Sequence, residues 1–156
     1  MPANPDHGRH VSLQLPLSEP CPFCECLQGR VPCAFVERTA TVAAFLNPTQ
    51  YESGALLIVP NVHVASVLDA SEDLVRDVHQ VARRWASRLV EALGATGVNV
   101  FQNNGVPAGQ TIAHYHVHVV PRYPGSDPAR RFREVDFEQA AHAELLATAA
   151  KLLESR

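Results

Sequence analysis

The chain of 156 residues lacks the features that mark several large classes of protein. Its apolar runs reach only about five residues, as at Ala55–Pro60, whereas a membrane-spanning helix needs about 20. Acidic residues outnumber lysine and arginine by 16 to 13, so no basic surface for a nucleic-acid backbone is expected. Repeats, heptads and low-complexity stretches are also missing. The composition excludes a membrane span, a basic nucleic-acid binder, a coiled coil, collagen and a disordered chain.

Two local features are missing as well. Residues 1–7 contain no basic stretch followed by an apolar one, which a secretory signal peptide requires, so we expect a cytoplasmic protein. Glycine-rich loops of the Walker A or dinucleotide-binding type are absent from the sequence. Any phosphate site must therefore be built from histidines and from the glycine-containing segment Asn103–Gly109.

The residues that are present suffice for one ordinary domain. Hydrophobic residues make up 46% of the chain and charged residues 19%, which allows a single core at this length. Two features stand out against this background. There are eight histidines, three of them at alternate positions, and all four cysteines fall within thirteen positions.

Periodicity predicts an α+β domain. An apolar stripe at helical spacing predicts one long helix, which Gly94 ends, and a capping pattern predicts a second helix near the C-terminus. The order of elements predicts a mostly antiparallel five-stranded sheet. The expected strands are Ala34–Arg38, Thr41–Leu46, Ala55–Pro60, Gly97–Gln102 and Ile112–Pro121, and the expected helices are Asp69–Leu93 and Phe137–Leu153.

The expected domain spans residues 21–125. Residues 1–20 are rich in proline and are expected to form a flexible arm, in which the alternation at Val11–Leu15 predicts a short edge strand. Residues 126–156 are expected to form a linker and the C-terminal helix. The isolated His79 and His142 are interpreted as packed core residues.

His114, His116 and His118 alternate with hydrophobic residues. In a strand, side chains alternate between faces, so the three imidazoles share one face, about 7 Å apart. Two interpretations remain open from spacing alone. The three histidines could bind one metal ion, or one could act as nucleophile or general base while its neighbours orient it and bind an anion.

The segment Asn103–Arg122 resembles the signature of the histidine triad family of nucleotide hydrolases and transferases. That signature is Gly-Gln, a short gap, and three histidines alternating with hydrophobic residues. Three further segments match the family in order, at Cys21–Cys24, Phe45–Pro48 and Leu57–His63. The resemblance extends from Cys21 to Arg122 and implies the family's fold.

The resemblance implies a role for each matching residue. His116 attacks the α-phosphorus of a purine nucleotide and becomes nucleotidylated, His118 donates to the phosphoryl oxygens, and His114 completes the triad. Neutral imidazole, abundant near its usual pKa of about 6.5, suits such an attack. Contacts to phosphate, leaving group or ribose are implied for Asn47, Asn103, Gln110 and Thr111. Without the resemblance, the two asparagines read equally well as turn residues.

The cysteine cluster has two interpretations. Cys21 and Cys24 have zinc-knuckle spacing, and the resemblance implies a structural zinc site completed by His63 and His114. A redox pair is the alternative, although the βαβ context typical of such a pair is missing. Because no signal peptide is evident, Cys26 and Cys33 are expected to be unliganded, reduced thiols.

Three functions remain as hypotheses. The first is an enzyme that cleaves nucleotides at the α-phosphorus, either nucleoside phosphoramidates or diadenosine polyphosphates, with Thr111 and Pro121-Arg122 favouring the second substrate. The second is a zinc hydrolase with all three histidines on the metal. The third is a nucleotide-binding module without catalysis. Apolar candidates for a base pocket, which core packing could equally explain, are Phe23, Val36, Leu46 and Val59.

A homodimer with joined sheets is also implied by the resemblance. The long helix carries apolar residues off its main stripe, at Val75, Val90 and Ala92 beside Trp85, and these need cover. A partner subunit could cover them, and so could the C-terminal helix of the same chain.

Overall fold

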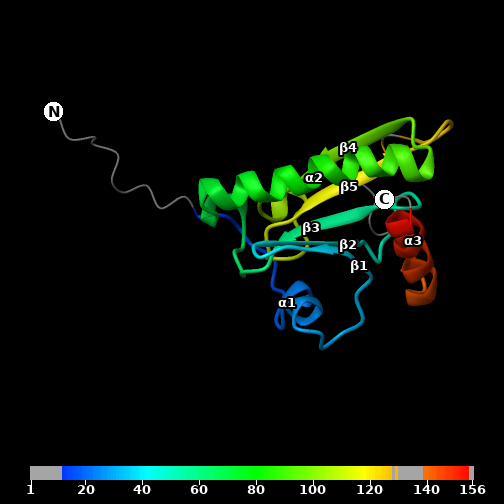
Figure 1. The fold of residues 1–156 in the computed structure, drawn as a ribbon. Coiled ribbons are helices and arrows are strands. Elements are labelled where there is room, and N and C mark those ends of the chain that lie inside the picture. Colours follow the sequence, from blue (N-terminus) through cyan, green and yellow to red (C-terminus); the bar gives the residue numbers. More distant parts are fainter. Residues whose placement is uncertain (1–11, 128, 130–138, 155–156) are drawn as a thin grey trace.

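The computed structural model describes residues 12–127, 129 and 139–154. Its core is one five-stranded sheet with helices packed against it (Figure 1). The strands are β1 (Phe35–Arg38), β2 (Val42–Leu46), β3 (Leu56–Pro60), β4 (Gly97–Phe101) and β5 (Val117–Arg122). The helices are α1 (Pro22–Leu27), α2 (Glu72–Leu93) and α3 (His142–Glu154), with short 3-10 turns at Val67–Asp69 and Val106–Ala108.

The sheet confirms the expected fold class. Its spatial order is β1-β2-β3-β5-β4, and every neighbouring pair is antiparallel. All residues of β2, β3 and β5 are buried, which explains why β2 and β3 are apolar on both faces. β4 lies at one edge of the sheet, beside β5.

Helix α2 covers one face of the sheet. It begins after Ser71, whose hydroxyl accepts a hydrogen bond from the backbone N–H of Leu74, and ends at Gly94 with φ 68°. Of the two caps that the sequence allows, Asp69 and Ser71, the structure confirms Ser71, because Asp69 instead caps the preceding turn together with Ser66. The predicted apolar stripe is buried, with Trp85 only 2% exposed.

Helix α1 lies on the opposite face of the sheet, where Figure 1 shows it below the strands. It was not predicted, because its six residues are too few for a helical period. Its Phe23 and Cys26 pack with Phe45 and Leu57 from the central strands. This second, smaller core lies between α1 and the sheet, and the sheet separates it from the main core under α2.

The C-terminal helix begins later than predicted. Gln139 forms an isolated antiparallel bridge with Thr49, and the N–H of Ala140 donates to the carbonyl of Pro48, so helix α3 begins only at His142. The predicted start, at Asp136 and Phe137, lies outside the described residues. Helix α3 buries Leu145, Ala149 and Leu152 in the same core as α2.

Three smaller predictions are wrong. Residues 12–15 form no strand, and Val11 lies outside the described residues. The N-terminal segment instead lies along the loop before β5, where the carbonyl of Gln14 accepts from the N–H of Val106. His79 and His142 are exposed and not core residues. Among the described residues, no helix combines the length and apolar character needed to cross a membrane.

Candidate active site

The three histidines lie on the face of the sheet that carries α1. Only His118 belongs to β5, which begins five residues later than predicted, and His114 and His116 lie in the bent segment before it. The ring of Phe23 contacts both, with centroid distances of 5.7 and 5.1 Å. Their hydrophobic neighbours point into the α2 core, as alternation predicts: Tyr115, Val117 and Val119.

A backbone carbonyl fixes the tautomer of His116. Nδ1 of His116 lies 2.6 Å from the carbonyl oxygen of His114. Because a carbonyl only accepts, Nδ1 must carry the proton, and Nε2 is the unprotonated nitrogen of the neutral ring. The two residues are two positions apart, in a segment that does not have strand structure. The arrangement gives His116 a nucleophilic nitrogen.

His118 is held between aromatic rings. Phe101, its cross-strand partner on β4, stacks on it with centroids 4.5 Å apart and planes 5° apart, and Tyr51 meets it edge-on at 5.9 Å. Burial, with a smaller contribution from nearby His116, lowers the pKa of His118 to about 3. Its Nδ1 makes no hydrogen bond within the described residues. The ring is therefore neutral at pH 7 and fixed in orientation.

A cavity of about 280 Å³ opens beside these two histidines. His116 and His118 form part of its wall, and most of the remaining wall is apolar or aromatic. A hollow of this kind, with few polar groups, is typical of a small-molecule site. Its other lining residues are Pro22, Phe23, Cys26, Val31, Pro32, Phe45, Asn47, Pro48, Thr49, Leu57, Thr111, Ile112 and Gln139.

The sequence identified the base-pocket candidates only in part. Phe23 lines the cavity, whereas Val36 and Leu46 point into the core on the opposite face and Val59 packs beneath α1. Alternate side chains of a strand point to opposite faces of the sheet, and the sequence did not show which of those side chains line the cavity. The wall residues Phe45 and Leu57 were missed, although each alternates with a residue of the α2 core in its own strand.

The predicted substrate-binding residues divide into two groups. Asn47, 6% exposed, and the exposed Thr111 line the cavity. Asn103 and Gln110 are not among the lining residues, and both side-chain amides hydrogen-bond to the backbone. Asn103 donates to the carbonyl of Gly109, and Gln110 accepts from Gly105 and donates to the carbonyls of Ala65 and Ile112. Their substrate contacts stay a prediction.

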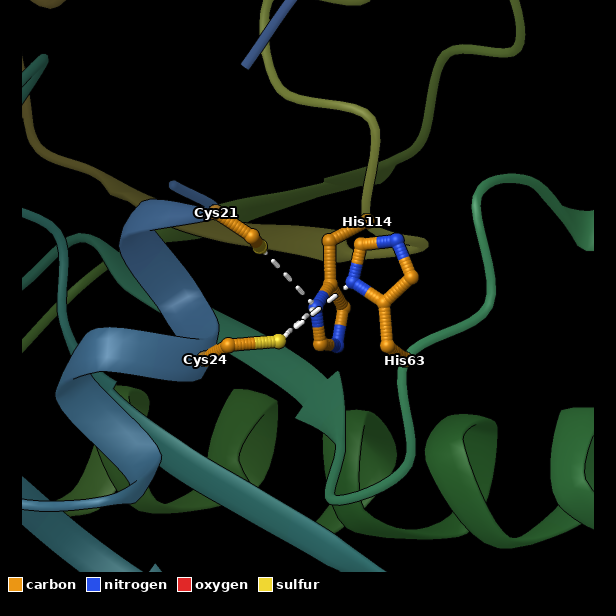
Figure 2. Close-up of side chains that lie close together, drawn as sticks. All are labelled: Cys21, Cys24, His63 and His114. Carbon is orange, nitrogen blue, oxygen red and sulfur yellow. Dashed lines mark hydrogen bonds between the residues drawn. The ribbon is translucent and has the colours of Figure 1, made fainter. Parts of the chain in front are cut away.

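His114 lies apart from the cavity, in a cluster with Cys21, Cys24 and His63. Figure 2 shows the four side chains converging from α1, from the segment after β3 and from the segment before β5. Nδ1 of His114 is 3.4 Å from Sγ of Cys21 and 3.7 Å from Sγ of Cys24, and Nδ1 of His63 is 3.3 Å from Sγ of Cys24. All four candidate ligand atoms lie within 4.8 Å of one another, so the cluster could hold a metal ion.

The chemistry of the cluster fits a closed tetrahedral zinc site. Zn–S and Zn–N bonds of about 2.3 and 2.0 Å place ligand atoms roughly 3.5 Å apart, close to the distances found. Nε2 of His114 lies 2.9 Å from the carbonyl of Pro60, which directs Nδ1 to the cluster. Burial lowers the pKa of His114 to about 4 and raises that of Cys24 to about 11. The imidazole is already neutral, and a cation would have to displace the thiol proton.

Cys26 and Cys33 form a disulfide, which corrects the expectation of two reduced thiols. Their Cα atoms are 5.6 Å apart because α1 turns the chain back toward β1. Sequence spacing could not reveal this pairing, since it depends on the unpredicted helix. Cys21 and Cys24 are not disulfide-bonded to each other, and their sulfurs lie beside His63 and His114, as the zinc interpretation expects.

A second hollow, about 470 Å³, lies between α2 and β1. Two ion pairs lie in its wall: Arg84 lies 2.7 Å from Glu37, which also accepts from the indole of Trp85, and Arg88 lies 3.5 Å from Glu91. It contains none of the histidines. The cavity beside His116 is therefore the candidate active site, although it is smaller.

A family model describes this combination of fold and histidines. The model of the HIT domain matches residues 28–125. The chain belongs to the HIT domain family. Protein hit of Bacillus subtilis is 33% identical over 110 residues, which span 70% of this chain and 76% of that protein. Adenosine 5'-monophosphoramidase HNT1 of Saccharomyces cerevisiae is 30% identical over 145 residues, spanning 88% of this chain and 87% of the yeast protein.

Solved structures agree with the HIT fold. A zinc-bound histidine triad family protein from Mycobacterium smegmatis superposes with a TM-score of 0.68 at 28% identity, over 90% of this chain and 100% of that one. Residues 139–156 lie beyond the stretch that the HIT domain model matches. The part of the cavity wall made by Gln139 thus lies outside the residues that the HIT domain model matches.

Proposed function

We propose that the protein is a nucleotide hydrolase or nucleotidyl transferase in which His116 attacks the α-phosphorus of an adenosine nucleotide. The observation that carries this proposal is the bond from Nδ1 of His116 to the carbonyl of His114, beside a cavity of nucleotide-binding character. Relatives named as adenosine 5'-monophosphoramidases support an adenosine nucleotide with a phosphorus–nitrogen bond as substrate.

The proposed reaction has two steps. Nε2 of His116 forms a bond to the α-phosphorus while the bond to the leaving group breaks, and the leaving group departs as a phosphate anion or as an amine that takes up a proton from solvent. Water then attacks the same phosphorus, the bond from phosphorus to Nε2 breaks, and the nucleoside monophosphate is released. The proton that the attacking water loses passes to solvent, and the imidazole returns to its neutral form. Throughout, the carbonyl of His114 holds the Nδ1 proton and stabilises the positive charge on the ring.

His118 and Asn47 are proposed to hold the substrate. A neutral His118 whose ring is fixed by Phe101 can donate one N–H to a phosphoryl oxygen without reorganising. The Oδ1 of Asn47 accepts from the N–H of Thr49, which orients the amide at the cavity wall toward a ribose hydroxyl.

The cluster of Cys21, Cys24, His63 and His114 is proposed to bind a structural zinc ion. Four protein ligands leave no open position for substrate, so such an ion stabilises the fold and takes no part in the reaction. A zinc hydrolase using all three histidines is disfavoured by the same geometry. Among the described residues, the only metal-competent group includes His114 alone of the triad.

The decisive experiment replaces the nucleophile. His116→Ala should lower turnover of adenosine 5'-phosphoramidate by more than about a thousandfold, because it removes the attacking nitrogen. AMP affinity should change by no more than about threefold, since the cavity walls remain. Mass spectrometry of quenched wild-type protein should show an adenylyl group on His116.

The control is His79→Ala, which removes an exposed histidine on α2 and should leave turnover unchanged. Retained turnover in His116→Ala would contradict the covalent mechanism. AMP binding without turnover in the wild type would instead favour a nucleotide-binding module. Diadenosine tetraphosphate, assayed in parallel, distinguishes the phosphoanhydride substrate from the phosphoramidate.

A further inference from the structure

The chain downstream of the HIT domain match supplies one side of the cavity. Gln139 lies 14 residues beyond the last matched residue and lines the same cavity as His116. Two backbone contacts hold it there: the bridge from Gln139 to Thr49, and the 2.9 Å hydrogen bond from Ala140 to the carbonyl of Pro48. Because these contacts use only main-chain atoms, they leave the side chain of Gln139 available.

The other walls of the cavity can bind the flat face of a base, but they cannot distinguish one base from another. Phe23, Phe45, Leu57 and Ile112 offer apolar surface, which binds the face of any flat ring about equally well. Hydrogen bonds to the edge of the ring distinguish one base from another. Recognition of that edge requires a polar side chain other than the histidines proposed to bind the phosphate.

Few lining side chains meet this requirement. The Oδ1 of Asn47 is already occupied by the N–H of Thr49, and hydroxyl groups such as those of Thr49 and Thr111 are single, freely rotating partners. Of the other lining residues that the structure describes, Gln139 alone carries a planar amide with a donor and an acceptor side by side. Within the described residues, its side chain makes no hydrogen bond, and it is exposed at the cavity mouth.

We propose that Gln139 recognises the 6-amino edge of adenine. Adenine presents an amino donor next to a ring-nitrogen acceptor on both of its accessible edges, and a glutamine amide matches that pair with two hydrogen bonds. Unsubstituted purine, which has hydrogen in place of the 6-amino group, offers only the ring-nitrogen acceptors on these edges. This inference rests on the proposed function and adds to it the residue that determines base preference.

The test compares AMP with purine riboside 5'-monophosphate, which lacks the 6-amino group, by calorimetric titration. Wild-type protein should bind AMP about five- to tenfold more tightly, the worth of roughly one net hydrogen bond. Gln139→Leu, similar in size but without the amide, should bind the two ligands within about twofold of each other. Gln139→Ala should behave in the same way, which guards against a steric effect of leucine.

The matched control is Glu144→Gln, an exposed change on α3 outside the cavity, which should keep the wild-type discrimination. The inference would be overturned if both Gln139 variants still preferred AMP over purine riboside 5'-monophosphate, or if the wild type showed no such preference. In either case, AMP binding and turnover by the wild type would still support the proposed function. Failure of the wild type to bind AMP would overturn the proposed function and the inference with it.

Discussion

His118 illustrates how the surroundings of one side chain set its chemistry. Its imidazole is 3% exposed, stacked on Phe101 and close to His116, and these surroundings disfavour the charged form. In the unfolded chain the same ring has a pKa of about 6.5. The difference in pKa couples protonation of His118 to the stability of the fold.

The free energy of unfolding should therefore fall as pH falls from about 6 toward 4. Over that range the unfolded state binds a proton at His118, while the folded state, with a pKa of about 3, does not. The contribution of this one group is at most about 1.4 kcal/mol per pH unit. Urea unfolding of the wild type and of His118→Gln at pH 7, 6 and 5 measures it as the difference between the two slopes.

Both proteins keep the cysteines and histidines of the metal cluster, so protonation of that cluster cancels in the difference. Parallel pH dependences in wild type and His118→Gln would show that His118 titrates normally in the folded chain. The lowered pKa, and the neutral donor assigned to this residue, would then be wrong.

At the scale of elements, α1 shows how six residues link two sites. Its first turn brings Cys21 and Cys24 to the metal cluster, and Phe23 lies between that cluster and the cavity. Cys26 forms the disulfide that closes the following loop and also lines the cavity. A disulfide and the cluster proposed to bind zinc therefore both meet at one wall of the candidate active site.

Two cysteine variants should separate these cross-links. Cys24→Ser should reduce bound zinc from about one ion per chain to a small fraction and should lower the melting temperature, because a structural metal contributes directly to folding. Cys33→Ser should keep the zinc but lower the free energy of unfolding by up to about 2.5 kcal/mol, since it opens a loop with a sequence separation of 7. Metal analysis and thermal unfolding of both variants provide the measurements. A zinc content unaffected by Cys24→Ser would exclude the proposed cluster.

At the scale of the whole molecule, the sheet has two edge strands, β1 and β4, and helix α3 packs against β1. Within the described strands, β4 pairs only with β5, and Val100 on β4 and Val90 on α2 are 46% and 45% exposed. Helix α3 buries residues in the same core as α2, and Trp85 is buried within the chain, which leaves Val90 as the exposed residue of the off-stripe group. An open edge strand and exposed valines favour the predicted dimer, in which two sheets join.

Light scattering should give a mass near twice 17.0 kDa. Val90→Glu should shift this mass toward the monomer, because it places a charge on the exposed apolar face of α2. Leu146→Glu on α3, at a residue of similar exposure (48%), is the control and should leave the mass unchanged. A monomer that persists at all concentrations in the wild type would contradict the dimer.

Local pattern determined much of this protein by itself. The five strands, the long helix with its Gly94 terminus and the common face of the three histidines follow from periods of two and 3.6 residues, which the chain itself specifies. The tertiary structure decided the remainder, because it depends on residues far apart in sequence. Only the folded chain brings Cys24 to His63, Cys26 to Cys33, and Gln139 to Thr49 beside the cavity, and no local period records such contacts.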